Sequence, residues 1–309
     1  MLGNQVISEG LAAGAGCEAA RVLPLAGAGE RAAGLDLYAI MTLLLLLLYP
    51  SGFWYVRIPV TVLCVSAFVF RPLRLDPRFW FVVAMTVMAG NYQNWFLVDN
   101  HKYLLGYWCL SLFCCLQTDD PRKTLAVIAR WLIGLSFLFA VFWKIASGDY
   151  LDSTFFHYSL LLDDRFRAIS ESLGGMTREM TEANHTAYRA LVNFDSRHEA
   201  VPLLFPGGVS NLARLFTWWT LLIEVLVAAA FLWPQGKLVS RWRDYILLCF
   251  ILSTYSVAPV LGFGWTLIIM GLAQCDGRLK YVPRLYMIAF VILQVYNLPF
   301  RAILAADPG

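Results

Sequence analysis

Long runs of hydrophobic residues, separated by short polar stretches, fill the chain from about residue 36 onward. A helix that crosses a bilayer needs about 20 mostly apolar residues, and by that measure the pattern predicts nine spans. Their approximate limits are 36–52, 55–71, 79–98, 102–117, 124–146, 211–233, 243–257, 259–275 and 284–302. The fourth is short, and Pro259, Gly262 and Gly264 interrupt the seventh and eighth. The expected fold class is therefore all-α, a polytopic membrane bundle.

Two segments lie outside this pattern. Residues 1–33 are rich in Gly and Ala and lack the basic start and apolar core of a signal peptide, so we expect a flexible lead-in. Residues 34–309 then form one transmembrane domain. Within it, 147–210 is the only long loop, and we expect it to fold as a cap with helical pieces around 177–193.

Composition agrees with a multi-pass protein of the cell membrane. Of the 309 residues 59% are hydrophobic and 15% charged, whereas soluble domains have about 45–50% and about 25%. Membrane lipids are thus the first expected partners. No basic run with interleaved aromatics indicates binding to nucleic acid. The seven cysteines are odd in number and form no CxxC pair, which argues against a disulfide framework or a zinc site.

The distribution of Lys and Arg predicts the orientation. Basic residues gather in the loops after the second, fourth, sixth and eighth runs, namely Arg71, Arg74, Arg78, Arg122, Lys123, Lys237, Arg241, Arg243, Arg278, Lys280 and Arg284. The alternate short loops offer only Arg57 and Lys102. Because cytoplasmic loops carry the excess of positive charge, we expect a cytoplasmic N-terminus, an extracytoplasmic C-terminus and an extracytoplasmic loop 147–210.

Lys144 and His101 are the first candidates for chemistry. Lys144 lies 20 residues after Thr124, about 30 Å along a helix and thus at the outer boundary of the membrane. It either snorkels to the interface or acts as a base. His101 begins the fourth run, where Asn100 is a natural helix cap. Helical rise brings both residues to similar heights, so a shared proton is one hypothesis.

Other polar residues have weaker functional signals. Glu224 lies deep in LFTWWTLLIEVLVAAAFLWP, so we expect it to face the protein interior, either protonated or paired with Arg130 or with a polar group of another span. Arg130 itself is expected to snorkel or to form a structural ion pair. His157, His185 and His198 share the long loop, but no HxxxH or HExxH spacing occurs, and no metal site is predicted.

Several short segments resemble one membrane family. NHKYLLG, residues 100–106, resembles the Asn-His-x-Tyr-Leu-x-Gly signature of the vitamin K-dependent γ-glutamyl carboxylase membrane domain, within the wider HTTM superfamily. RWLIGLSFLFAVFWKIASGDYLDS is similar to its fifth-span region, where a Lys follows an Arg by fourteen residues, as Lys144 follows Arg130. LLIEVLVAAAFLW and VLGFGW resemble a later acidic span and a Gly-aromatic hinge.

The resemblance implies a mechanism and site residues. In that family a lysine base deprotonates a reduced naphthoquinone, oxygen adds, and the strong base so formed removes a proton from a substrate carbon, which carbon dioxide traps. Lys144 would be the base, and His101 and Asn100 would bind the quinone oxygen. The enzyme would then be a carboxylase and epoxidase of the carbon–carbon lyase class. One departure is ILSTYSVAPV, residues 251–260, which has hydroxyls where family members often have a histidine.

Two readings of function from different classes stay open at this point. One is quinol-coupled oxidation, carboxylation or peptide modification at the extracytoplasmic face, with no metal. The other is a non-catalytic membrane partner in the maturation or export of a secreted peptide. A transporter is disfavoured because no internal repeat is visible and Glu224 is the only deep charge.

Overall fold

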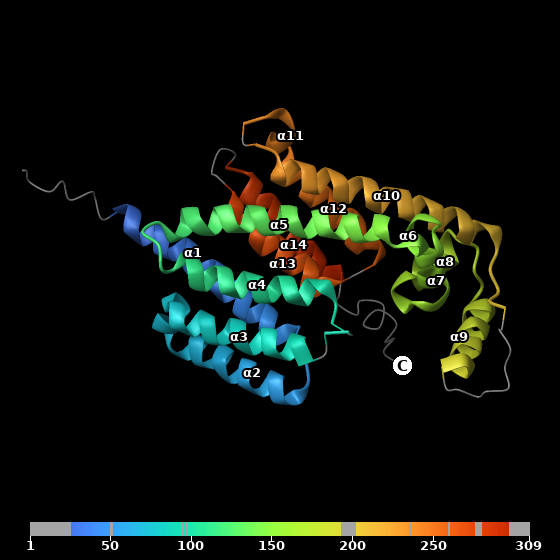
Figure 1. Ribbon diagram of the computed structural model, residues 1–309, viewed down its shortest axis with the longest axis horizontal. Helices are drawn as coiled ribbons and strands as arrows, with labels where there is room; N and C mark the ends of the chain where they lie inside the picture. The colour runs from blue at the N-terminus through green and yellow to red at the C-terminus, as the bar shows by residue number, and fades with distance from the viewer. Residues whose placement is uncertain are drawn as a thin grey trace, which may run out of the picture.

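The structure is a computed structural model that describes residues 26–49, 52–93, 95–96, 98–192, 202–234, 236–258, 260–275 and 280–296. Over these ranges the chain forms helices and no strands, as the sequence predicts (Figure 1). The nine predicted apolar runs coincide with α1 (Ala26–Leu48), α2 (Trp54–Val69), α3 (Pro77–Gln93), α4 (Asn100–Cys115), α5 (Pro121–Ala146), α10 (Gly207–Leu232), α12 (Arg243–Val257), α13 (Leu261–Gln274) and α14 (Val282–Tyr296). The shorter elements are η1 (Arg71–Leu75), α6 (Gly148–Leu151), α7 (Thr154–Leu162), η2 (Asp164–Phe166), α8 (Arg167–Ser172), α9 (Arg178–Val192) and α11 (Leu238–Arg241).

Six of these nine helices have only 14 to 17 residues, fewer than a membrane span usually requires. Among the described residues only α5 and α10 are long and apolar enough to cross a membrane by length and composition. Helices α12, α13 and α14 have 15, 14 and 15 residues, or about 21–23 Å against a hydrocarbon core of about 30 Å. The prediction overestimated them because apolar residues continue past the helix ends, as at Trp95 and Phe96 after α3.

One predicted boundary moves, and another lies outside the described residues. Helix α1 begins at Ala26, within the predicted lead-in of residues 1–33, and residues 1–25 lie outside the described part. Residues 297–302 of the ninth predicted span also lie outside it. The prediction for 177–193 is confirmed by α9.

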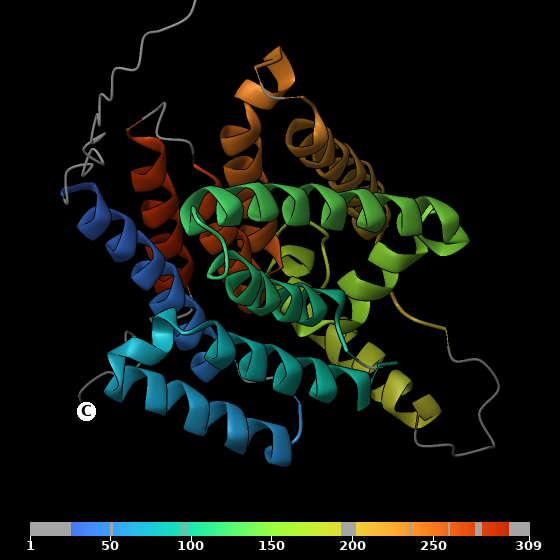
Figure 2. The ribbon, with the colours of Figure 1, turned by 60° about the vertical axis from the view of Figure 1, so that its left-hand side comes forward.

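Helix α5 is the centre of the bundle. It packs most extensively against the antiparallel α10, and also against α13 and α4 (Figures 1 and 2). Pro121 and the Asp120 side chain, which accepts a hydrogen bond from the Lys123 backbone N–H at 3.1 Å, start the helix. Gly134 allows close contact with α10, because a Cβ there would lie 2.6 Å from a Leu232 methyl carbon.

A cap covers one end of the bundle. We define the cap as α6 to α9 with their connections, residues 147–192 and 202–206, and we call the end it covers the cap end. Tyr150, Phe156 and Phe166 form its core together with residues of the first half of α10. Asn184 anchors α9 by accepting from the Leu204 N–H at 2.7 Å and donating to the Leu204 carbonyl at 2.8 Å. The opposite end, where α5 begins and α10 ends, is called the far end.

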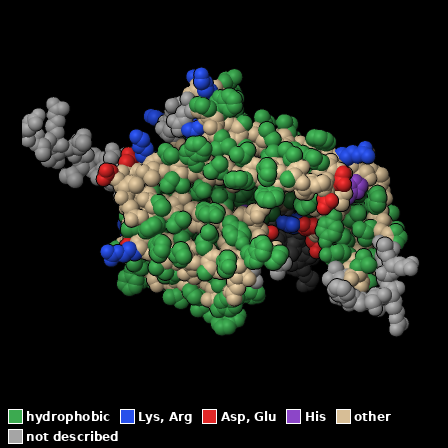
Figure 3. Space-filling model, in the orientation of Figure 1, with side chains coloured by type: hydrophobic (Ala, Val, Ile, Leu, Met, Phe, Trp, Pro, Cys, Tyr) green, Lys and Arg blue, Asp and Glu red, His purple; other side chains and the backbone are tan. Residues whose placement is uncertain are grey.

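The described surface is strongly apolar (Figure 3). Helix α5 exposes one stripe at helical spacing, made of Val127, Trp131, Leu135, Leu138 and Phe142. Helices α2, α10 and α14 expose similar stripes. Contiguous apolar surface of this extent is what a lipid or protein neighbour covers, since water solvates it poorly.

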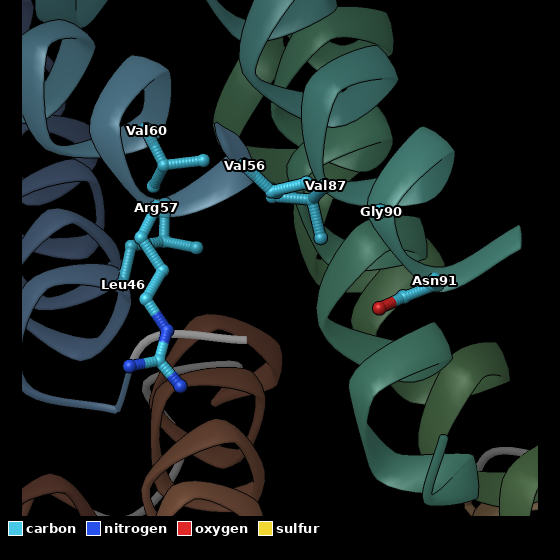
Figure 4. A pocket seen from close by; sticks show the side chains of 7 residues that line it. All are labelled: Leu46, Val56, Arg57, Val60, Val87, Gly90 and Asn91. Atoms are coloured by element: carbon cyan, nitrogen blue, oxygen red, sulfur yellow. The ribbon is translucent and has the colours of Figure 1, made fainter. Parts of the chain in front are cut away.

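The seam between α2 and α3 is tightly packed (Figure 4). Its cavity has a volume of only about 10 Å³ and lies beside Val56, Val60 and Val87. A Cβ added at Gly90 would lie 2.8 Å from a Val56 methyl carbon. A volume of about 10–15 Å³ holds at most one water molecule, so this seam is no ligand site.

Candidate functional site

Lys144 of α5 and Glu224 of α10 form an ion pair inside the bundle. The Lys144 ammonium donates to Glu224 Oε1, and the two side chains are 21% and 8% exposed. Side chains lean toward the N-terminus of their helix, so Lys144 leans inward along α5 rather than outward to the interface. The expectation that Glu224 faces the interior is confirmed, and its partner is Lys144 rather than Arg130.

The pair is only partly satisfied by hydrogen bonds. Glu224 Oε2 is buried and has no hydrogen-bond partner among the described residues. The Tyr255 hydroxyl of α12 is also buried without such a partner in this part of the chain, and it interacts electrostatically with Glu224. An unbonded buried carboxylate oxygen is costly, so this position has spare capacity to accept a proton or a donor.

The cap contributes an aromatic ring to the pair. Lys144 Nζ lies 5.0 Å from the centre of the Tyr150 ring, a distance at which cation and ring attract. Burial raises the pKa of the Tyr150 phenol, the nearby Thr220 hydroxyl opposes this, and the Glu224 charge raises it further. Tyr150 therefore stays neutral at physiological pH and serves as a fixed ring over the ammonium group.

His101 lies in the first turn of α4, away from this pair. Its ring stacks on Phe263 of α13, with centroids 5.7 Å apart and planes at 28°. The carboxylate of Asp99 is 3.9 Å from His101 Nε2. Asn100 is the exposed first residue of α4, whereas Asp99 occupies the N-cap position and makes no capping hydrogen bond with its side chain. The prediction of Asn100 as the cap was thus wrong by one residue, because the helix starts earlier.

An open cavity of about 350 Å³ adjoins His101. It lies between α1, α4 and α13, and its lining residues are Leu45, Tyr49, Asp99, His101, Lys102, Leu105, Val260, Leu261, Gly262 and Thr266. Sites for small molecules typically have volumes of about 300–1,000 Å³ and mostly apolar walls with a few polar groups. The volume and lining therefore suit a small ligand with an apolar body and one or two polar atoms.

Aromatic rings separate the His101 cavity from the ion pair. Neither Lys144 nor Asn100 lines the cavity. The Phe263 ring stacks with that of Phe137, with centroids 6.3 Å apart, and meets the Tyr255 ring edge-on, with centroids 6.5 Å apart. Tyr255 in turn interacts electrostatically with Glu224. The predicted pair of His101 and Lys144 thus shares the cap end of the bundle, and a layer of rings lies between the two residues.

Arg130 has a structural role at the far end. Its Nε donates to the Phe231 carbonyl at 2.8 Å, and its Nη2 donates to the Trp233 carbonyl. Both acceptors belong to the C-terminal end of α10, where carbonyls lack helical partners and a cation is favoured. The predicted structural role holds, but the partners of Arg130 are backbone carbonyls in place of a carboxylate.

The cap brings charge to the rim of the His101 cavity. Arg165 pairs with Asp163, with Nε 3.0 Å from Oδ1 and 2.9 Å from Oδ2, and it interacts electrostatically with Asp99 and His101. Burial raises the pKa of Asp163, but hydrogen bonds from Arg165 outweigh it and hold that pKa below its usual value. In Figure 3 a hollow separates the cap from the helical body, with basic and acidic atoms at its edge.

The sequence did not predict that three aromatic residues belong to this site, namely Tyr150, Tyr255 and Phe263. Aromatics are frequent throughout the chain, so their type gave no signal. Comparison with protein-family models, with curated proteins and with solved structures finds no match. The assignment of function therefore rests on the residues and geometry described above.

Proposed function

We propose that this chain is a multi-pass membrane protein in which all nine helices of the apolar runs cross the bilayer. The apolar stripes of the described surface support this, and local thinning of the bilayer accommodates the short helices. The cap end is extracytoplasmic and the far end cytoplasmic, in keeping with the distribution of Lys and Arg. In this orientation Lys144, Glu224 and His101 all lie toward the extracytoplasmic face.

The proposed activity is quinol-coupled chemistry of the type that the resemblance to vitamin K-dependent carboxylases implies. A reduced naphthoquinone would supply the reducing electrons for oxygen when bound. The His101 cavity suits it in size, in its apolar walls and in the flat Phe263 ring beside the imidazole. His101 would hold a polar oxygen of the ring, while Asn100 lies outside the lining and is the weaker of the two predicted contacts.

The observation that carries the proposal is the buried Lys144–Glu224 pair with its unbonded carboxylate oxygen. One proton can move from the Lys144 ammonium to Glu224, which leaves a neutral amine and a neutral acid with no net change of charge. The neutral form escapes the cost of burying two ions. The pair can thus present a free amine, which is the species that a base requires. Because Phe263 and Tyr255 lie between this pair and the His101 cavity, the proposed chemistry requires a proton to pass this layer of rings.

A conservative substitution tests this role. In Lys144→Arg the charge and the ion pair remain, but arginine has a pKa above about 12 and cannot act as a base. With a reduced naphthoquinone and oxygen in vesicles, we expect quinol oxidation to fall at least about a hundredfold, with an unchanged thermal midpoint. Lys123→Arg, the same change at an exposed far-end residue, is the control and should keep full activity.

The outcome also separates the two classes of function. Full quinol oxidation by a well-folded Lys144→Arg protein would refute the assignment of Lys144 as the base. If neither the wild type nor any variant oxidises quinol, while the wild type retains a secreted peptide in a pull-down from membranes, the non-catalytic partner becomes the better proposal.

A further inference from the structure

A second cavity of about 350 Å³ lies at the far end, between α1, α13 and α14. Figure 2 shows α1 and α14 side by side. Residues of both helices and of the end of α13 line the cavity. Its walls are Leu37, Tyr38, Leu272, Cys275, Pro283 and Met287, and two arginines, Arg122 and Arg284, complete it. We call it the arginine groove.

The two arginines have no neutralising partner among the described residues. Neither forms an ion pair with a carboxylate of this part of the chain, and both are exposed. Three acids of the same end are engaged elsewhere. Asp36 pairs with Arg71 and Arg74 at 3.4 and 3.1 Å, Asp120 caps α5, and Asp244 accepts from Tyr286 at 3.0 Å. The groove thus carries a net positive charge.

Apolar surface continues from the groove along α1 and α14 toward the cap end of the bundle. Leu37, Leu44 and Leu48 form an exposed stripe along α1, and Met287, Val291 and Val295 form one along α14. Eleven residues of α1 cover about 16 Å, which matches half of the roughly 30 Å hydrocarbon core. A ligand on this surface would therefore have a charged head at the arginines and apolar chains as long as one leaflet.

We propose that the arginine groove binds one anionic phospholipid of the cytoplasmic leaflet. Its phosphate bridges Arg122 and Arg284, whose planar guanidinium groups match phosphate oxygens in pairs. Its acyl chains cover the stripes of α1 and α14. Basic pockets between transmembrane helices on the cytoplasmic side commonly hold anionic headgroups. The His101 cavity has the same volume, but in its described lining Asp99 offsets Lys102 and no arginine pair is present, so the two cavities select different ligands.

Native mass spectrometry of the full chain in neutral detergent tests the proposal, with dioleoylphosphatidylglycerol and dioleoylphosphatidylcholine as probes. The wild type should bind phosphatidylglycerol at least tenfold more tightly than phosphatidylcholine. Arg122→Gln with Arg284→Gln should weaken that binding roughly thirtyfold, since each arginine contributes about a factor of five or more near an anionic surface. The matched control, Arg78→Gln with Arg241→Gln, removes two exposed arginines outside the groove and should change binding by less than about twofold.

Met287→Trp gives an independent check, because it narrows the groove and keeps both arginines. It should also weaken lipid binding, with the thermal midpoint unchanged in lipid-free detergent. Equal weakening in the matched control pair would show only general attraction to charge and overturn the proposal. So would equal binding of the two lipids, or inorganic phosphate that displaces the lipid at a similar concentration.

The same spectra report any other occupant of the groove. A dimer that disappears in the Arg122 and Arg284 variant would place a second copy of the chain there and refute the lipid assignment. The inference shares with the proposed function only the membrane placement of the helices. Lipid binding and quinol oxidation are separate readouts, so failure of one leaves the other standing.

Discussion

One cluster of buried polar groups lies at each end of the bundle, and the two clusters differ in how fully they are hydrogen-bonded. At the far end, Arg243 Nε donates to Gln274 Oε1 at 2.7 Å, and Gln274 Nε2 donates to Asp244 and to the Gly271 carbonyl. Tyr286 donates to the same Asp244 oxygen at 3.0 Å. At the cap end, Lys144 satisfies one oxygen of Glu224 and leaves the other unbonded.

The difference separates structural from functional use of buried charge. A network in which the members are bonded rigidifies a fold, whereas one that is partly bonded costs free energy. A protein retains such a cost where the unbonded atom has a task. The far-end network therefore has the features of a structural clamp, and the Glu224 site those of a reactive one.

The largest expected effect comes from Glu224→Lys, which would bury two ammonium groups side by side. We expect no folded protein from this variant, because like charges in the interior have no compensation. Glu224→Gln keeps the shape but leaves the Lys144 charge unpaired, and should lower the free energy of unfolding by about 3–5 kcal/mol.

Size-exclusion chromatography and thermal unfolding measure both Glu224 variants. Glu171→Gln and Glu171→Lys serve as matched controls, since this glutamate pairs with Arg167 on the surface with 37% of its side chain exposed. Their effects should stay below about 1 kcal/mol. Equal stability of Glu224→Gln and Glu224→Lys would contradict a confined interior site.

The second-largest expected effect concerns the hydrogen-bonded network at the far end. Gln274→Ala removes the bridge between Arg243 and Asp244, so we expect the free energy of unfolding to fall by about 2–4 kcal/mol. Quinol oxidation per folded molecule should stay at the wild-type value, because the network is remote from the cap end. Gln117→Ala, an exposed amide bonded to the Phe113 carbonyl, is the control. Loss of activity at unchanged stability in Gln274→Ala would erase the distinction between the two ends.

The smallest effect concerns the rim of the His101 cavity and depends on pH. The pKa of Asp163 is held below its usual value of about 3.9. Its contribution to stability is thus fully present above pH 4 and is lost as pH falls through the folded-state pKa. Because Arg165 is half exposed, we expect at most about 1 kcal/mol.

Thermal midpoints between pH 2 and 7 provide the measurement for Asp163. The curves of the wild type and Asp163→Asn should differ above pH 4 and converge at the acid end. Glu182→Gln removes a more exposed pair with Arg178 and should show a smaller difference. A gap between wild type and Asp163→Asn that widens in acid would have the wrong sign and would exclude this role.

The hydrophobic runs were sufficient to predict where the helices lie in the sequence but not how long each helix is. A hydrophobic run of sufficient length predicts a helix, and such runs predicted the positions of α1 to α5, α10 and α12 to α14. Where each helix ends depends on turns such as the one that begins at Ala258, directly after α12 ends at Val257. Such turns contain apolar residues too, so hydropathy alone extended the runs.

The site was predictable one residue at a time and unpredictable as a set. The depth of Lys144 and Glu224 in apolar runs marked each of them as unusual. Their pairing depends on the antiparallel contact of α5 with α10 across 80 positions of sequence. His101 was placed at the correct end, yet its neighbour is Phe263, because the rotation of α4 about its axis cannot be read from spacing.

Because α5 and α10 are antiparallel neighbours, the chain leaves the bundle at Ser147 and returns at Pro206 beside the point of departure. The cap is therefore an insertion between two adjacent helix ends. The cap end can therefore be remodelled by changes confined to 147–206 while the path of the chain through the bundle stays as it is. Of the residues that contact the Lys144–Glu224 pair, Tyr150 is the one such a remodelling would replace.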